Sequence, residues 1–231
     1  MNLYMKYLSV LIYFSFFYSN GFTQKFSTSI NAQLAIPQLD YKETNPEAGF
    51  GLRANFLYKP GVDIPIKFGI EMGMQEKGRA TQYFSGYING YYDEFKVSAT
   101  NNVFSLMFLT RFLSPKFGKI KSFIDLTAGW NVFYSTVDVE RLTFYSDYNS
   151  SYSNSSKAHW ALAYGVAGGV DIPLNKRDDI GLELKVAYLI GNNSRYLTDP
   201  YIDNNANVSF VEKNSRTNML IPQAGVRIAI K

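Results

Sequence analysis

The residues best suited to nucleophilic chemistry lie close together in the second half of the chain. His159 is the only histidine, and Ser155 and Ser156 precede it by a few positions. A histidine that acts as general base toward a serine hydroxyl is the arrangement used by membrane-embedded barrel hydrolases and acyltransferases. A lone His–Ser proximity is a weak indication, and an interfacial histidine beside Trp160 accounts for the same residues. We therefore expect a protein that is not an enzyme, with a lipid-modifying enzyme as a less favoured alternative.

Composition excludes several other kinds of site. The chain has no cysteine, so thiol nucleophiles, disulfides and Cys-ligated zinc are ruled out, and one histidine cannot build a zinc site of the usual kind. The net charge of +4 is mild, and no Lys/Arg block suggests nucleic acid. We expect no metal and no cofactor.

A third set of chemically active residues is charged and follows an alternating spacing. Bases and acids nearly balance, and all occupy the odd-numbered positions of apolar-alternating segments. Such a set could line an ion path or form a locked salt-bridge network. Eight strands leave a lumen only wide enough for side chains, so we expect the locked network. Its members are Arg53, Lys67, Glu71, Arg111, Asp125, Asp171, Glu183, Lys185 and Arg227.

The segments that carry these charges have the period of two that is typical of β-strands. In Ile180–Ile190 every even position is apolar, and the odd positions include Gly181, Glu183 and Lys185. The same parity recurs in seven other segments, each long enough to cross a membrane as a strand. The eight predicted strands are Phe26–Ile36, Ala48–Tyr58, Ile66–Gln75, Asn102–Leu113, Ser122–Thr136, His159–Ile172, Ile180–Ile190 and Asn218–Ile230.

The connections between these strands alternate between long and short. Three are tight (Lys59–Asp63, Ser114–Gly118 and Pro173–Asp179), and the other four are longer and polar. Outer-membrane barrels have this asymmetry, with short periplasmic turns and longer external loops. The sequence thus predicts an all-β fold: an eight-stranded antiparallel up-and-down transmembrane β-barrel in the outer membrane of a Gram-negative cell.

The alternation of apolar and polar residues does not by itself show which face lies inside, since the strands of a soluble lipocalin-like binder would alternate in the same way. Two features favour an apolar face that looks outward into lipid. The polar face is rich in small residues such as Gly69, Gly129 and Gly165, which suit a crowded lumen and weaken an exposed strand. Aromatic residues of the apolar face also gather near the strand ends, as in interfacial girdles. These aromatics are Phe26, Phe56, Tyr58 and Phe112 toward the turns, and Phe50, Tyr134, Trp160 and Tyr188 toward the loops.

The N-terminus has the pattern of a secretory signal peptide. A short region with one positive charge precedes a mostly apolar run, residues 7–18, that is too short to span a bilayer as a helix. Small residues allow cleavage after Gly21 or Thr23. We expect residues 1–23 to be removed and residues 24–231 to form the barrel.

Two of the long connections have the composition of binding loops. They contain GYINGYYDEF and SDYNSSYSNSS, in which Tyr offers rigid contact area and Ser, Asn and Gly adapt. A merely solvated loop fits the same composition equally well. Besides outer-membrane lipid, the partners we expect are envelope or secretion-complex proteins that contact these loops.

The mature chain resembles a known group of small barrels. After the TQK at the signal-peptide junction, the Gly-rich hairpin AGFGLRANFLYKPG and the strand FGIEMGMQEKG are similar to the small outer-membrane barrels ("porin family", PorT-like) of Bacteroidota. PorT-like members are associated with the type IX secretion system, and others are surface barrels. The resemblance assigns no role to any single residue.

Together these observations predict a non-enzymatic outer-membrane protein with a plugged lumen. An envelope structural component, a surface-binding protein and an accessory subunit of a secretion complex are the expected roles. A small-solute, porin-like channel is the main alternative.

Overall fold

The architecture is described from a computed structural model of the chain, which covers residues 25–61, 64–88, 91–114, 120–142, 152–155, 158–203 and 207–230. The predicted signal peptide lies outside the described residues. The elements are β1 (Lys25–Pro37), α2 (Asp40–Thr44), β2 (Gly49–Lys59), β3 (Ile66–Ile88), β4 (Tyr91–Leu113), β5 (Lys121–Arg141), β6 (Tyr152–Ser155), β7 (His159–Pro173), β8 (Ile180–Gly191), β9 (Asn193–Ile202), β10 (Val208–Arg216) and β11 (Met219–Ile230).

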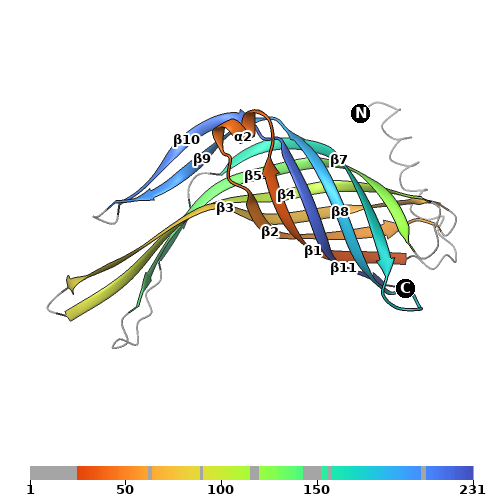
Figure 1. Cartoon of the computed structure of the whole chain (residues 1–231), viewed down its shortest axis with the longest axis horizontal. Coiled ribbons are helices and arrows are strands. Elements are labelled where there is room, and N and C mark those ends of the chain that lie inside the picture. The colour runs from red at the N-terminus through yellow and green to blue at the C-terminus, as the bar shows by residue number, and fades with distance from the viewer. Residues whose placement is uncertain are drawn as a thin grey trace, which may run out of the picture.

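Eight of these strands close into a ring in which every neighbouring pair is antiparallel. The order is β1-β2-β3-β4-β5-β7-β8-β11, and β11 returns to β1 through pairs such as Ile30 with Val226. Each strand therefore has two hydrogen-bonded neighbours. A closed ring leaves no free sheet edge at membrane depth, which is the condition for a sheet to lie in lipid. The eight predicted strands are thus confirmed as an eight-stranded antiparallel barrel (Figure 1).

The barrel has polar residues inside and apolar residues outside. Even-numbered side chains such as Phe50, Leu52 and Phe108 are about 60% exposed, whereas Arg53, Arg111 and other odd-numbered residues are buried. The predicted face assignment is therefore correct, and a lipocalin-like interior is excluded. An unbroken belt of exposed apolar side chains around a closed polar lumen is stable only where lipid covers it.

The interior is narrow enough that small residues are required at particular places. A Cβ on Gly73 would lie 3.0 Å from Nε of Arg53 and 3.1 Å from its Nη2, so glycine leaves the room that this buried guanidinium occupies. This close approach agrees with the expectation that glycines line a crowded lumen.

The strands are much longer on the loop side than predicted, and this corrects the sequence-based boundaries. The 76–101 connection was expected to be a long polar loop, but β3 and β4 remain paired from Arg79 opposite Thr100 to Ile88 opposite Tyr91. β5 likewise continues to Arg141, and β9 and β10 form a hairpin within the predicted 191–217 loop. These strand extensions project beyond one end of the barrel (Figure 1).

A β-bulge explains why alternation did not reveal the extension of β3. The register shifts between Glu76 and Arg79, and Gly78 has φ +83°, which glycine adopts without steric cost. Before the bulge the even positions Met72 and Met74 are exposed, and beyond it the odd positions from Arg79 to Ser85 are exposed. A one-residue insertion exchanges the two faces of a strand, so the apolar parity breaks at this point.

Beyond the rim, the extensions share a small apolar core of their own. Val97 and Ala99 of β4 and Ile202 of β9 are buried together, with Phe84 and Phe210 packed against them. The β9–β10 hairpin thus rests on the extended wall formed by β3, β4 and β5. The structured part outside the barrel is a second packed unit.

Candidate functional site

The centre of the lumen is organised around the guanidinium of Arg111 on β4. It makes a two-pronged contact with Asp125 on the neighbouring β5, at 2.7 Å from Nε and 2.9 Å from Nη2. Its Nη1 also donates to Oε2 of Glu183 at 2.6 Å, from β8 across the lumen. All three side chains are at most 2% exposed. Arg111 and Asp125 are direct cross-strand partners, so strand register positions the pair.

A second set of charges is joined to the first through Lys185. Nη1 of Arg53 donates to Oε1 of Glu71 at 2.8 Å, and the Lys185 ammonium contacts the other oxygen of Glu71. The same ammonium lies 3.5 Å from Asp125. The six residues of the two sets carry three positive and three negative charges. We call them the central network: Arg53, Glu71, Arg111, Asp125, Glu183 and Lys185.

Uncharged polar side chains of β1 and β2 make further hydrogen bonds to the central network. Ser29 donates to Glu183 at 3.2 Å, and Asn55 donates to Ser29 at 2.6 Å. Gln33 accepts from Nε of Arg53 at 2.7 Å. Buried charges are tolerated only when they are paired and hydrogen-bonded, and these residues provide the second condition. They occupy the same odd parity as the charges, which is the signal that could have identified them from sequence.

The other three predicted lumen residues lie toward the turn side. Arg227 contacts Asp171 at 2.6 Å and Asp178 at 2.8 Å, and Lys121 also contacts Asp178. Lys67 is separate: its ammonium donates to Oγ of Ser27 at 2.9 Å and forms no ion pair within the described part of the chain. All nine predicted residues thus face the lumen, but six form one network, two form a smaller one, and Lys67 joins neither.

Asp178 lies in the turn between β7 and β8, outside the membrane-spanning strands. Partial burial acts to raise the pKa of its carboxyl, but the hydrogen bonds and charges of Lys121 and Arg227 outweigh this and lower the pKa. This turn residue, which the sequence did not indicate, is therefore an anionic bridge between two lumen cations.

The loop side of the lumen is closed by an aromatic plug. Tyr41 of α2 is fully buried and packs edge-on against Phe133 at 6.2 Å and Tyr196 at 5.1 Å between ring centroids. Thr44 of α2 shares a 2.5 Å hydrogen bond with the Tyr196 hydroxyl. Burial, and then the neighbouring Tyr196, raises the pKa of Tyr41. We call Tyr41, Lys77, Phe133 and Tyr196 the loop-side plug.

Lys77 is the unusual member of this plug. The lipid-facing part of β3 ends at Met74, so Lys77 lies outside the membrane-spanning segment. It is 1% exposed, and its ammonium sits 3.9 Å from the Tyr41 ring centroid in a cation–π contact. Among the described residues it has no hydrogen-bond acceptor. Burial lowers its pKa to about 7, and the carboxylate of Glu47 opposes that shift.

The predicted girdle aromatics lie on the outer face or at its margins. Trp160 is 66% and Phe50 65% exposed near the loop side, where Tyr134 and Tyr188 are half-buried. On the turn side the Phe26 ring lies 5.3 Å from that of Phe56 and 5.4 Å from that of Tyr58. Phe112 is 40% exposed. Whether these side chains contact the lipid interface remains a prediction.

The residues considered for enzyme chemistry are not brought into a described catalytic arrangement. His159 is half-buried and lies opposite Phe133 in the β5–β7 ladder. Ser155 belongs to β6, and Ser156 lies outside the described residues. Within the described ranges, no group of three His, Cys, Asp or Glu side chains could hold a metal ion. In the same ranges, no helix is long and apolar enough to cross a membrane.

Closure, an inverted polarity and an internal charge network together decide the location. The chain is an outer-membrane β-barrel. Because outer-membrane barrels carry their short turns on the periplasmic side, we expect the strand extensions to lie outside the cell.

Comparison with solved structures finds small outer-membrane barrels. Neisserial surface protein A is 12% identical with a TM-score of 0.43, covering 89% of this chain and 96% of its own. A major outer membrane protein from Thermus thermophilus is 13% identical with a TM-score of 0.47, covering 90% and 100%. OprG from Pseudomonas aeruginosa is 12% identical with a TM-score of 0.44, covering 89% and 95%. No family model matches the chain, and no curated protein matches it.

Proposed function

We propose that this protein is a non-enzymatic surface-binding protein, in which a sealed barrel anchors a binding platform outside the outer membrane. The observation that best supports this proposal is the contrast between the barrel lumen and the strand extensions beyond its rim. The lumen is filled by the central network and the loop-side plug, while the strand extensions continue as packed β-structure. A filled lumen suits an anchor, and ordered extensions suit recognition.

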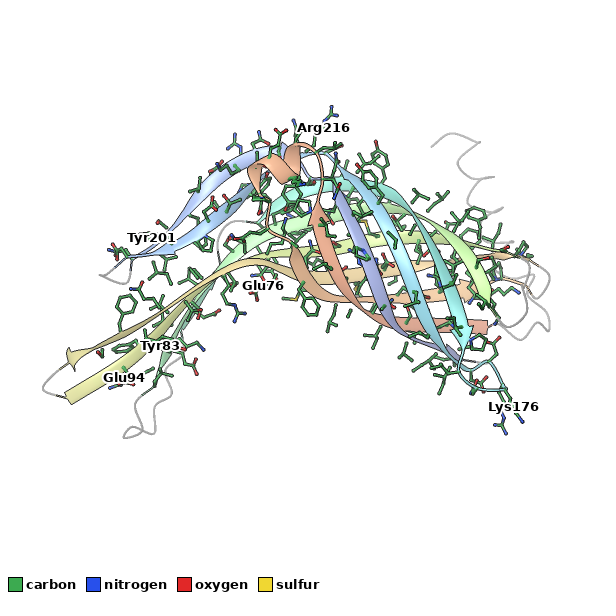
Figure 2. All side chains as sticks on the ribbon, viewed as in Figure 1. Glu76, Tyr83, Glu94, Lys176, Tyr201 and Arg216 are labelled. Carbon is green, nitrogen blue, oxygen red and sulfur yellow. The ribbon has the colours of Figure 1, made fainter. Side chains whose placement is uncertain are left out.

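The extensions expose side chains that are common in binding surfaces. Tyr83 on β3 is 67% exposed and Tyr201 on β9 is 63% exposed, on separate arms beyond the rim (Figure 2). Tyrosine buries a large area at a low entropic cost because it has few rotatable bonds. We propose that these arms bind a protein of the envelope or of a secretion complex.

The resemblance to PorT-like barrels of Bacteroidota supports the same role. We propose that the chain belongs with those small barrels and acts as an accessory of a secretion or transport assembly. The sealed lumen favours a docking role over transport through the barrel itself.

A photo-crosslinking experiment in live cells tests the platform. A photoreactive amino acid at position 83 or 201 of the full chain should capture the same discrete protein, and a Tyr→Ser change at the other position should reduce the yield. The matched control position is Trp160, which is equally exposed but faces the lipid belt. Adducts with lipid alone at positions 83 and 201, or an equal yield from position 160, would contradict a protein-binding platform.

Conductance separates this function from its main alternative. The refolded barrel in planar bilayers should show no current above the lipid background, because charged side chains and the plug occupy the lumen. Discrete current steps that persist in purified protein would instead support a small-solute channel.

A further inference from the structure

A cavity of about 450 Å³ opens at the turn-side end of the lumen. Its lining residues come from seven strands (β1, β2, β3, β4, β5, β7 and β11), from Ser114 just after β4 and from the β7–β8 turn. These segments lie at the end of the barrel opposite the strand extensions (Figure 1). We call it the turn-side cavity and define it by Lys59, Lys67, Arg111, Lys121, Arg177 and Arg227 together with Asp171 and Asp178. A volume of this size is within the ordinary range for small-molecule sites.

The charge of this cavity is strongly one-sided. Six bases and two acids line it, whereas the central network above it balances three against three. Both acids are already engaged, since Asp171 and Asp178 contact Arg227 and Asp178 also contacts Lys121. Arg111, at the inner end, is neutralised from behind by Asp125 and Glu183. Of the other three bases, Lys59 is also engaged, whereas Lys67 and Arg177 form no ion pair with the carboxylates of the described residues.

Lys67 is the clearest of the excess cations. It is half-buried, and the one hydrogen bond that it makes within the described residues is to Ser27, a neutral hydroxyl. Within the described residues no carboxylate lies at ion-pair distance from it. Removing a cation from bulk water without a counter-charge costs free energy, and a bound anion would lower that cost. Apolar neighbours in the wall, Leu113 and Phe123, strengthen an interaction with an anion because they exclude water.

We propose that the turn-side cavity binds a small multivalent oxyanion presented from the periplasm. The bases approach from β3, β4, β5, β11 and the β7–β8 turn, so an anion with several oxygens can contact more than one of them at once. Phosphate and carboxylate groups share this chemistry and both suit Lys and Arg donors. The site is at the far end of the lumen from the binding platform, so its failure and that of the proposed surface function are independent.

Isothermal titration of the refolded full chain in zwitterionic micelles at low salt tests the site, with inorganic pyrophosphate as the probe. Saturable one-site binding is expected. Lys67→Gln should weaken it about tenfold, the usual effect of losing one charge-assisted hydrogen bond. Lys176→Gln is the control: Lys176 lies in the β7–β8 turn beside Arg177, is exposed and does not line the cavity (Figure 2).

Two further arms complete the design. Citrate, titrated in parallel, reports the preference between carboxylate and phosphate groups. Saturable binding of either anion supports the site, and the tighter of the two shows which chemical group the site prefers. Lys67→Arg keeps the charge and should retain binding, and a heat-shifted band on a gel verifies that each variant is folded. The proposal is overturned if neither anion saturates, or if Lys176→Gln weakens binding as much as Lys67→Gln does.

Discussion

The central network and the loop-side plug fill the same lumen in opposite ways. In the membrane-embedded part, Arg111 and its neighbours form ion pairs of 2.6–2.8 Å in which every charge has an opposite partner. At the loop side, the ammonium of Lys77 lies over the ring of Tyr41, which itself packs against Phe133 and Tyr196, and it has no hydrogen-bond acceptor among the described residues. One region is closed by electrostatic matching and the other by apolar packing.

This difference reflects how each region is built. Facing strands of a barrel hold lumen side chains in fixed register, so three acids and three bases can be matched precisely in space. The central residue of the plug, Tyr41, comes from α2, a five-residue helix in the β1–β2 connection, which has no such register. The geometric requirement for packing aromatic rings is looser than the requirement for forming an ion pair. We therefore expect the central network to control the global stability of the barrel and the plug to control local opening.

The largest effect should come from removing the cation at the middle of the central network. Arg111→Met leaves Asp125 and Glu183 as buried carboxylates without their main partner, and breaking a buried pair in this way costs about 3–5 kcal/mol. Urea unfolding of the refolded barrel in lipid vesicles measures the change in the free energy of unfolding. Arg79→Met is the matched control, since its pair with Glu76 has side chains 57% and 37% exposed and should contribute about 0–1 kcal/mol. Equal losses from both variants would refute the assigned role of the network.

The next effect should be local and confined to the plug. Tyr41→Ala empties a fully buried aromatic site, and such truncations cost about 3 kcal/mol or more. Amide hydrogen exchange across residues 40–44 should accelerate strongly, while exchange in β4 and β8 stays slow. Tyr41→Phe is the control, because the Tyr41 hydroxyl has no hydrogen-bond partner among the described residues. Faster exchange throughout the barrel would show that the plug is not a separate unit.

A third prediction concerns pH. The pKa of Lys77 is about 7 when folded, below its ordinary value of 10.5, so between these values the unfolded state holds more protons than the folded state. Stability of the plug should therefore rise with pH in this window, by about 2 kcal/mol between pH 7.5 and 9.5, and the penalty is fully present below pH 7. Hydrogen exchange of α2, corrected for the intrinsic rate, measures this rise. The rise should vanish in Lys77→Met; its persistence there would assign the titration to another group.

The smallest expected effect lies at the junction between barrel and extensions. Gly78 adopts φ +83°, and an added Cβ would meet Oε2 of Glu47 at 2.4 Å. Gly78→Ala should cost about 1 kcal/mol, because a side chain is disfavoured in this conformation. Thermal unfolding measures it, and Gly168→Ala, where nothing lies within 4 Å of the added Cβ, is the control. Equal shifts in the two variants would mean that the bulge imposes no conformational requirement.

The barrel could be predicted from the sequence because a strand with one lipid-facing side and one lumen-facing side requires a strict alternation of apolar and polar residues. Eight of the nine charges identified from parity are buried, and the ninth, Lys67, is half-buried. The extensions were missed because the bulge at Gly78 exchanges the two faces of β3, although the Asn-Gly pair at 89–90 is a hairpin signal. Tyr41 and Lys77 were missed for a different reason: their contacts join a loop helix to distant strands, and no local pattern records that packing.

The two native tryptophans allow the most direct test of the central claim that the apolar face lies in lipid. Trp130 and Trp160 are 39% and 66% exposed on the outer face, and Trp160 pairs with Val132, two residues closer to the loop side. In vesicles of brominated lipids, with each tryptophan isolated by Trp→Phe at the other position, both should be quenched. Bromines deep in the acyl chain should quench Trp130 more, and bromines near the headgroup should quench Trp160 more. Absence of quenching at both positions, in protein that migrates as a folded barrel, would contradict the lipid-facing assignment on which the account rests.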